Sequence, residues 1–119
     1  MIVTQIVART EILATHEWPD APGHRKYLAS PHAHVFKIEA KALISEDRGI
    51  EFHDLRKRLH SVIGEIVNFR LMEDGPPSFG TMSCERIGQK ILELMPEVSF
   101  VIVSEDGQFD AEVFRCPAK

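Results

Sequence analysis

Three histidines carry the clearest chemical signal in this sequence. His32 and His34 flank a single alanine, so on an extended strand their imidazoles share one face, about two residues' rise apart. His16 has the same parity on an earlier alternating segment, and an antiparallel hairpin would place it beside the pair. Three neutral imidazoles with a fourth position open are the pattern of a catalytic zinc site. The spacing is therefore compatible with a metal site and equally with ordinary structural histidines.

Two alternating strands must position these histidines. Over residues 2–13 several apolar side chains fall on even positions, while the polar Gln5, Arg9 and Glu11 fall on odd ones, which is the period of a half-buried strand. A second such strand is expected over 32–44, with both of its histidines on the apolar face. Between them, residues 17–31 contain three prolines and a glycine and indicate a long loop. Long loops in compact domains are often functional.

Helical spacing governs the middle of the chain. Apolar residues recur every three or four positions from Phe52 to Ile66, and we expect this helix to end near Asn68. A second helix is expected to begin at Cys84, after a serine or threonine cap, and to continue to Met95, where a proline stops it. Each helix presents one apolar stripe, so both must pack against another element.

The remaining segments read as two more strands. An apolar, β-branched run covers 98–104, a turn is expected at Asp106-Gly107, and a short strand covers 111–115. The order strand, strand, helix, helix, strand, strand predicts an α+β fold, with a four-stranded antiparallel sheet and two helices on one face. The exposed sheet edges would need covering, and closing several sheets into a shared barrel would cover them.

Composition narrows the class of protein further. The chain has 119 residues, 44% hydrophobic and 27% charged, which predicts a single globular domain over 1–119. Its net charge of −4, without a basic cluster, makes a nucleic-acid partner unexpected. There is no apolar run long enough to cross a bilayer and no signal-peptide pattern, so a cytoplasmic location without a membrane partner is expected. Two cysteines without a CxxC spacing give no disulfide framework.

The ordered set of motifs resembles the 6-pyruvoyltetrahydropterin synthase family, which includes the 6-carboxytetrahydropterin synthases of queuosine biosynthesis. That family has a first histidine, a proline-rich loop, a Gly-His-Lys-Cys element and then His-Gly-His. The corresponding places here hold His16, Gly23-His24-Arg25 and His32-Ala33-His34. Segments 49–55, 82–85 and 103–105 resemble, in turn, the family's entries to its two helices and the strand end with its pterin-anchoring glutamate.

The resemblance implies a tunnelling fold with zinc held by His16, His32 and His34. It implies a lyase that eliminates triphosphate from dihydroneopterin triphosphate or a related pterin. Zinc suits this reaction because a metal stabilises negative charge developing on oxygen. Glu105 would anchor the pterin ring by accepting hydrogen bonds from its N–H groups. Family members are typically homohexamers of two stacked trimers, so a trimer or hexamer is expected.

The sequence departs from the family pattern at the proton-transfer groups. Lys26 and Tyr27 stand where the catalytic cysteine belongs, and Val67 and Asn68 stand where an Asp-His dyad belongs. The reaction is therefore expected to be altered. Tyr27, Lys26 or His24 is expected to act as the new acid or base, and a lysine in this role would need a lowered pKa.

Other interpretations stay open at this point. His60 or Cys84 could supply the missing group, since a thiol in the first turn of a helix can have a lowered pKa, although Cys84 also fits the buried stripe. The chain could instead be a non-catalytic zinc protein that binds a pterin or purine-like ligand, or an aldolase or epimerase of the same fold. Trp18 and Phe79 fall in loops, where an aromatic ring either stacks on a flat ligand or packs in the core.

Overall fold

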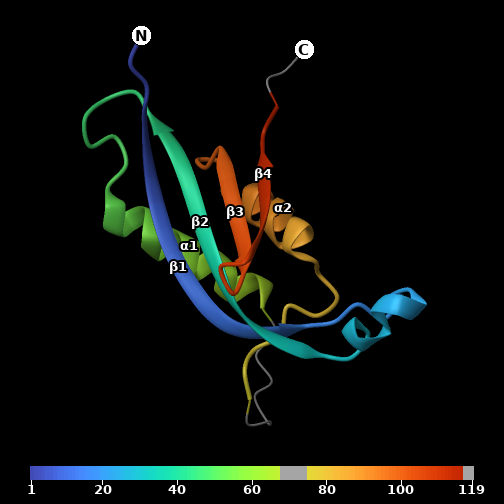
Figure 1. The fold of residues 1–119 in the computed structure, drawn as a ribbon. Coiled ribbons are helices and arrows are strands. Elements are labelled where there is room, and N and C mark those ends of the chain that lie inside the picture. Colours follow the sequence, from blue (N-terminus) through green and yellow to red (C-terminus); the bar gives the residue numbers. More distant parts are fainter. Residues whose placement is uncertain (68–74, 117–119) are drawn as a thin grey trace.

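One antiparallel sheet with both helices on the same face forms the architecture (Figure 1). The structure, a computed structural model, describes residues 1–67 and 75–116. Within these residues the sheet has the strand order β1-β2-β3-β4, with neighbouring strands antiparallel. The predicted α+β fold and its ββααββ order are confirmed. The elements are β1 (Thr4–His16), η1 (Gly23–Leu28), β2 (His32–Ile44), α1 (Phe52–Ile66), α2 (Cys84–Leu94), β3 (Phe100–Glu105) and β4 (Phe109–Phe114).

The β1–β2 hairpin is the longest feature of the sheet and carries the histidines at one end. Its register pairs Thr4 with Ile44 and His16 with His32. Even-numbered residues of both strands face the helices, and Phe36 and Ile38 are fully buried there. The hairpin runs on past both helices to the connection that contains η1 (Figure 1).

The helices cover the other end of this face. α1 packs on β1, while α2 packs on β3 and β4. Gly88 allows the close approach of α2 to the sheet, because a Cβ there would lie 2.7 Å from Cγ2 of Val113. Ser83 caps α2 by accepting a hydrogen bond from the Arg86 N–H at 3.1 Å, as the sequence predicted. This cap starts α2 at Cys84, next to the histidine end of the hairpin.

Several boundaries differ from those expected. β1 continues to His16, which pairs with His32 of β2. Segment 77–80 adds an isolated parallel bridge beside it: the Thr15 N–H donates to the Pro77 carbonyl at 3.0 Å and the Phe79 N–H to the Thr15 carbonyl at 2.8 Å. Loop 17–31 contains the 3₁₀ helix η1, whose short turns give no detectable periodicity. β3 starts at Phe100, because the Val98 N–H donates to Met95 in a turn. The predicted end of α1 at Asn68 lies just outside the described residues.

The second face of the sheet has no helix among the described residues. Arg9 and Glu39 form an ion pair there at 2.8 Å, and the Phe100 and Phe114 rings stack with centroids 5.2 Å apart. This face therefore mixes charged and aromatic side chains. No helix in the described part of the chain is long and apolar enough to cross a membrane.

Candidate metal centre

Three imidazoles converge at the open end of the hairpin. His16 lies opposite His32 in the register, and His34 follows two residues later on the same face. Each residue offers a ring nitrogen, and these three nitrogens all lie within 4.8 Å of one another. The sequence prediction that a hairpin gathers these histidines is confirmed.

The hydrogen bonds of the three rings fix their tautomers. Each Nδ1 lies within hydrogen-bonding distance of an oxygen that can only accept, so each neutral ring must carry its proton on Nδ1 and donate it. Nε2 is then left with a free lone pair, which is the form that ligates metals. The three pairs are His16 with the Met82 carbonyl at 3.0 Å, His32 with the Ser30 carbonyl at 2.9 Å, and His34 with the Asp106 carboxylate at 2.8 Å.

The carboxylate of Glu105 faces two of these free nitrogens. It lies 3.3 Å from Nε2 of His16 and 3.6 Å from Nε2 of His34. Lone pairs and a carboxylate at such distances repel one another unless a positive charge lies among them. A proton is disfavoured on His16, because burial lowers the pKa of this imidazole below its ordinary value. The donor set therefore fits a divalent cation such as zinc.

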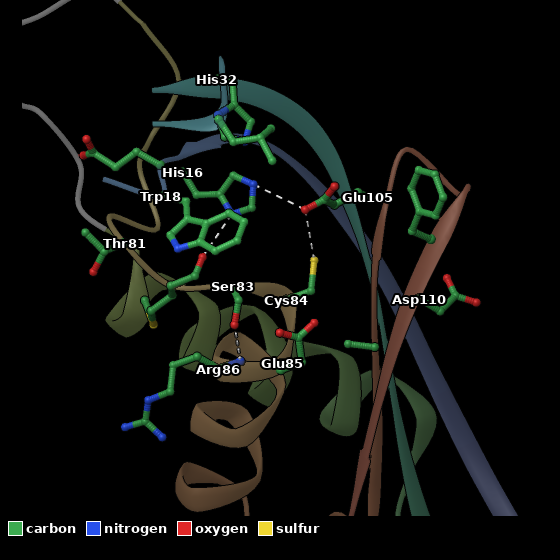
Figure 2. A pocket seen from close by; sticks show the side chains of 15 residues that line it. His16, Trp18, His32, Thr81, Ser83, Cys84, Glu85, Arg86, Glu105 and Asp110 are labelled. Atoms are coloured by element: carbon green, nitrogen blue, oxygen red, sulfur yellow. Dashed lines mark hydrogen bonds and ion pairs between the residues drawn. The ribbon is translucent and has the colours of Figure 1, made fainter. Parts of the chain in front are cut away.

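A pocket of about 580 Å³ opens beside the cluster (Figure 2). Its volume lies in the range of small-molecule sites. Dashed lines in this view join Glu105 to both His16 and Cys84, and Trp18 and the start of α2 border the pocket. Phe109, which is 70% exposed, also lines it. The pocket thus combines carboxylates, a thiol and two aromatic side chains next to the imidazoles.

Cys84 lies where the hydrophobic core meets this pocket. It belongs to the buried core, and its thiol donates a hydrogen bond to Oε1 of Glu105 at 3.6 Å. Burial, with the nearby charge of Glu105, raises the pKa of this thiol to about 12. Of the two interpretations of Cys84, the structure supports the buried one. A thiolate activated by the helix N-terminus is not what this environment favours.

The other predicted acid–base residues lie away from the cluster in this chain. His24, Lys26 and Tyr27 are exposed on η1, and none of them lines the pocket. His60 is on α1, with Nε2 2.7 Å from Oγ1 of Thr10, outside the pocket. The catalytic roles suggested for the η1 residues remain predictions.

The structure also locates the residues that stand where the family has its Asp-His dyad, and the two aromatic residues predicted to lie in loops. Val67 caps the end of α1 and is buried, while Asn68 lies outside the described residues. Phe79 is buried against Phe36, with ring centroids 5.0 Å apart, so it is a core residue. Trp18 instead lines the pocket and is 47% exposed.

One functional contact was missed by the sequence analysis. Asp106 was read only as a turn residue, yet its carboxylate holds His34. The available signal was its position directly after Glu105, at the strand end nearest the histidines. The main-chain carbonyls of Ser30 and Met82 gave no signal, because any residue type supplies a carbonyl.

The fold was compared with those of known proteins. No family model and no curated protein matches the sequence. The crystal structure of Plasmodium vivax 6-pyruvoyl tetrahydropterin synthase matches with a TM-score of 0.65 at 17% identity, covering 97% of this chain and 99% of that one. The Plasmodium falciparum enzyme matches with a TM-score of 0.65 at 16% identity, covering 95% and 98%. A P. vivax variant with a catalytic glutamate changed to alanine matches with a TM-score of 0.64 at 16% identity, covering 97% and 99%.

These likenesses span nearly the whole of each chain. The protein therefore has the fold of the 6-pyruvoyltetrahydropterin synthases, as a divergent example with low sequence identity. This is the tunnelling fold that the sequence motifs predicted.

Proposed function

We propose that the protein is a zinc-dependent pterin-processing enzyme. Its substrate would be dihydroneopterin triphosphate or a related pterin, and its reaction an altered form of the family's triphosphate-eliminating lyase chemistry. The observation that carries this proposal is the convergence of one ring nitrogen from each of three imidazoles beside a pocket of small-molecule size. The shared fold with pterin synthases supports the substrate class.

Each part of the site has a role in this proposal. His16, His32 and His34 hold the metal, which when bound supplies Lewis acidity toward an oxygen of the substrate. Glu105 accepts hydrogen bonds from ring N–H groups, and the Cys84 thiol donates to the same carboxylate. The exposed part of Trp18 offers a surface on which a flat ring stacks.

Carboxylates of the pocket are candidates for the proton-transfer group. Glu17, Glu85 and Glu105 line the pocket and supply carboxylates able to take a proton. The P. vivax enzyme has a glutamate as a catalytic residue, so a catalytic carboxylate has a precedent on the same fold. Tyr27, Lys26 and His24 remain candidates in an assembly with sites between subunits, where η1 of one chain would approach the pocket of another.

The resemblance to the 6-pyruvoyltetrahydropterin synthases also supports proposals for assembly, location and pathway. We propose a homotrimer or homohexamer, in which the uncovered sheet face lies inside a shared barrel. A cytoplasmic location and a place in queuosine biosynthesis are proposed on the same basis.

A second candidate is a non-catalytic protein that binds a pterin or purine-like ligand. The observation in its favour is that His24, Lys26 and Tyr27, which stand where the family's catalytic element belongs, do not line the pocket of this chain. A retained pocket without its acid–base group would bind a ligand and leave it unchanged.

Product analysis separates the two candidates. Zinc-quantified protein is incubated with dihydroneopterin triphosphate, with and without acetaldehyde trapping, and the products are identified by mass spectrometry. Release of triphosphate together with a new pterin supports the enzyme. Unchanged substrate, with quenching of the single Trp18 fluorescence on ligand addition, supports the binder. Unchanged substrate without quenching would contradict both.

The controls for this experiment are two histidine variants. His34→Ala removes one predicted ligand and should abolish turnover. His53→Ala removes a histidine on α1 that contacts Glu51 and lies outside the cluster, so its product profile should match that of the wild type.

A further inference from the structure

Asp106 holds the β2 strand at the position of His34. Its Oδ2 accepts a hydrogen bond from Nδ1 of His34 at 2.8 Å, and its Oδ1 accepts one from the Val35 N–H at 2.8 Å. The Asp106 N–H donates in turn to the Val35 carbonyl at 2.9 Å. The two carboxylate oxygens and the backbone thus fix one imidazole and the peptide that follows it.

The turn between β3 and β4 aims this carboxylate. Asp106 has φ 54° and Gly107 has φ 72°, and two successive left-handed residues are the requirement of a type I′ turn. The Gln108 N–H closes the turn on the Glu105 carbonyl at 2.9 Å. Aspartate and asparagine tolerate this conformation better than most residues, because their short polar side chains bond locally.

His34 differs from the other two histidines in what holds it. The Nδ1 atoms of His16 and His32 donate to main-chain carbonyls, which no substitution at those positions removes. The Nδ1 of His34 donates to a side chain, and that side chain is charged. Its ring orientation and tautomer therefore depend on one replaceable residue.

We propose that Asp106 is a positioning residue for the metal centre, a role that rests on the proposed function. The carboxylate holds His34 in the Nδ1–H form and leaves Nε2 free to ligate. Without this acceptor, the proton would move to Nε2, the nitrogen it prefers in the free histidine side chain, and would block the ligand atom. A carboxylate behind a ligating histidine also raises the basicity of the ligand.

The direct test is the tautomer of His34 in the metal-free protein at pH 8, read from long-range ¹H–¹⁵N NMR correlations. The wild type should show a protonated Nδ1 and an unprotonated Nε2. Asp106→Gly removes the carboxylate while accepting the positive φ without strain, and it should shift the proton to Nε2. Asp106→Asn keeps a side chain suited to this φ but offers only one accepting oxygen to two donors, Nδ1–H of His34 and the Val35 N–H, so the share of its Nδ1–H tautomer should lie between that of the wild type and that of Asp106→Gly.

Zinc affinity, measured by competition with a chromophoric chelator, provides the second readout. Asp106→Gly should bind zinc about 10- to 100-fold more weakly than the wild type, and Asp106→Asn should recover part of the loss. Asp47→Asn, an exposed substitution before α1, is the matched control and should bind like the wild type. An unchanged His34 tautomer in Asp106→Gly, or unchanged zinc affinity in that variant, would overturn the proposal.

The two proposals fail in different ways. A wild-type protein that binds no zinc would overturn the metal site itself. In that case the tautomer measurement, which needs no metal, still decides whether Asp106 controls His34.

Discussion

The two ends of the β1–β2 hairpin share one pattern of alternating side chains but differ in what the inward face forms. At the helix-covered end, the inward face carries apolar residues such as Ile38, Ala40 and Ala42, all fully buried. At the other end, the same face carries the three histidines, and a pocket lies beside them. Strand parity decides which side chains share a face. What packs over that face decides whether it becomes a core or a site.

Removal of a histidine should produce the largest difference between the two ends. His34→Ala should lose zinc binding at equimolar metal, since two imidazoles remain of the three. Its metal-free unfolding midpoint should change little, because this ring lies at the uncovered end. Zinc content after desalting and urea denaturation measure the two effects. His53→Ala is the control, and full zinc occupancy in His34→Ala would contradict the assignment.

Truncation in the core should instead cost the most stability. Phe36 is fully buried and contacts Phe79, so Phe36→Ala should cost about 3–5 kcal/mol of unfolding free energy. Phe114→Ala, at an exposed ring that stacks on Phe100, should cost less than about 1.5 kcal/mol. Urea denaturation of the metal-free proteins gives both values. Equal losses would show that the covered face does not dominate stability.

The reactivity of Cys84 should show whether the start of α2 belongs to the buried core or to the open site. Because burial and Glu105 raise the pKa of its thiol to about 12, little thiolate exists at pH 8. Iodoacetamide should therefore modify Cys84 more than about a hundredfold more slowly than the exposed Cys116, which is an internal control. Peptide mass spectrometry follows both rates. Equal rates would mean that the start of α2 belongs to an open, reactive site instead of to the core.

The smallest effect is expected at the N-terminus of α1, on the covered side. Glu51 accepts hydrogen bonds from His53 and from the Asp54 N–H, and these lower the pKa of its carboxyl below the ordinary value of 4.5. A lowered folded-state pKa adds stability above the unfolded pKa, and this stability is lost as pH falls through the folded value. The unfolding midpoint of Glu51→Gln should therefore lie slightly below that of the wild type at pH 7, and the gap should close as the pH falls below the ordinary carboxyl value of 4.5. A gap independent of pH would contradict this role.

How far the sequence predicted the molecule depends on which interactions side-chain patterns encode. The even parity of His16, His32 and His34 was enough to predict both the hairpin and the cluster, because a strand places alternate residues on one face. The stripe that includes Cys84 likewise predicted its burial. Patterns of this kind are local and periodic.

The hydrogen-bond partners of the imidazoles could not be predicted from such patterns. The acceptors for His16 and His32 are carbonyls, which every residue has, and the contact of Asp106 with His34 depends on a turn seventy-two positions away in the chain. The contact of Cys84 with Glu105 depends on how α2 packs against β3. These are tertiary relations without a sequence period.

The central claim is that the three histidines form a zinc site, and X-ray absorption at the zinc edge tests it most directly. The wild-type protein, loaded with one equivalent of zinc and desalted, should show only nitrogen and oxygen ligands at about 2.0–2.1 Å, with the outer-shell scattering of imidazoles. A sulfur ligand at about 2.3 Å, or no zinc retained after desalting, would contradict it.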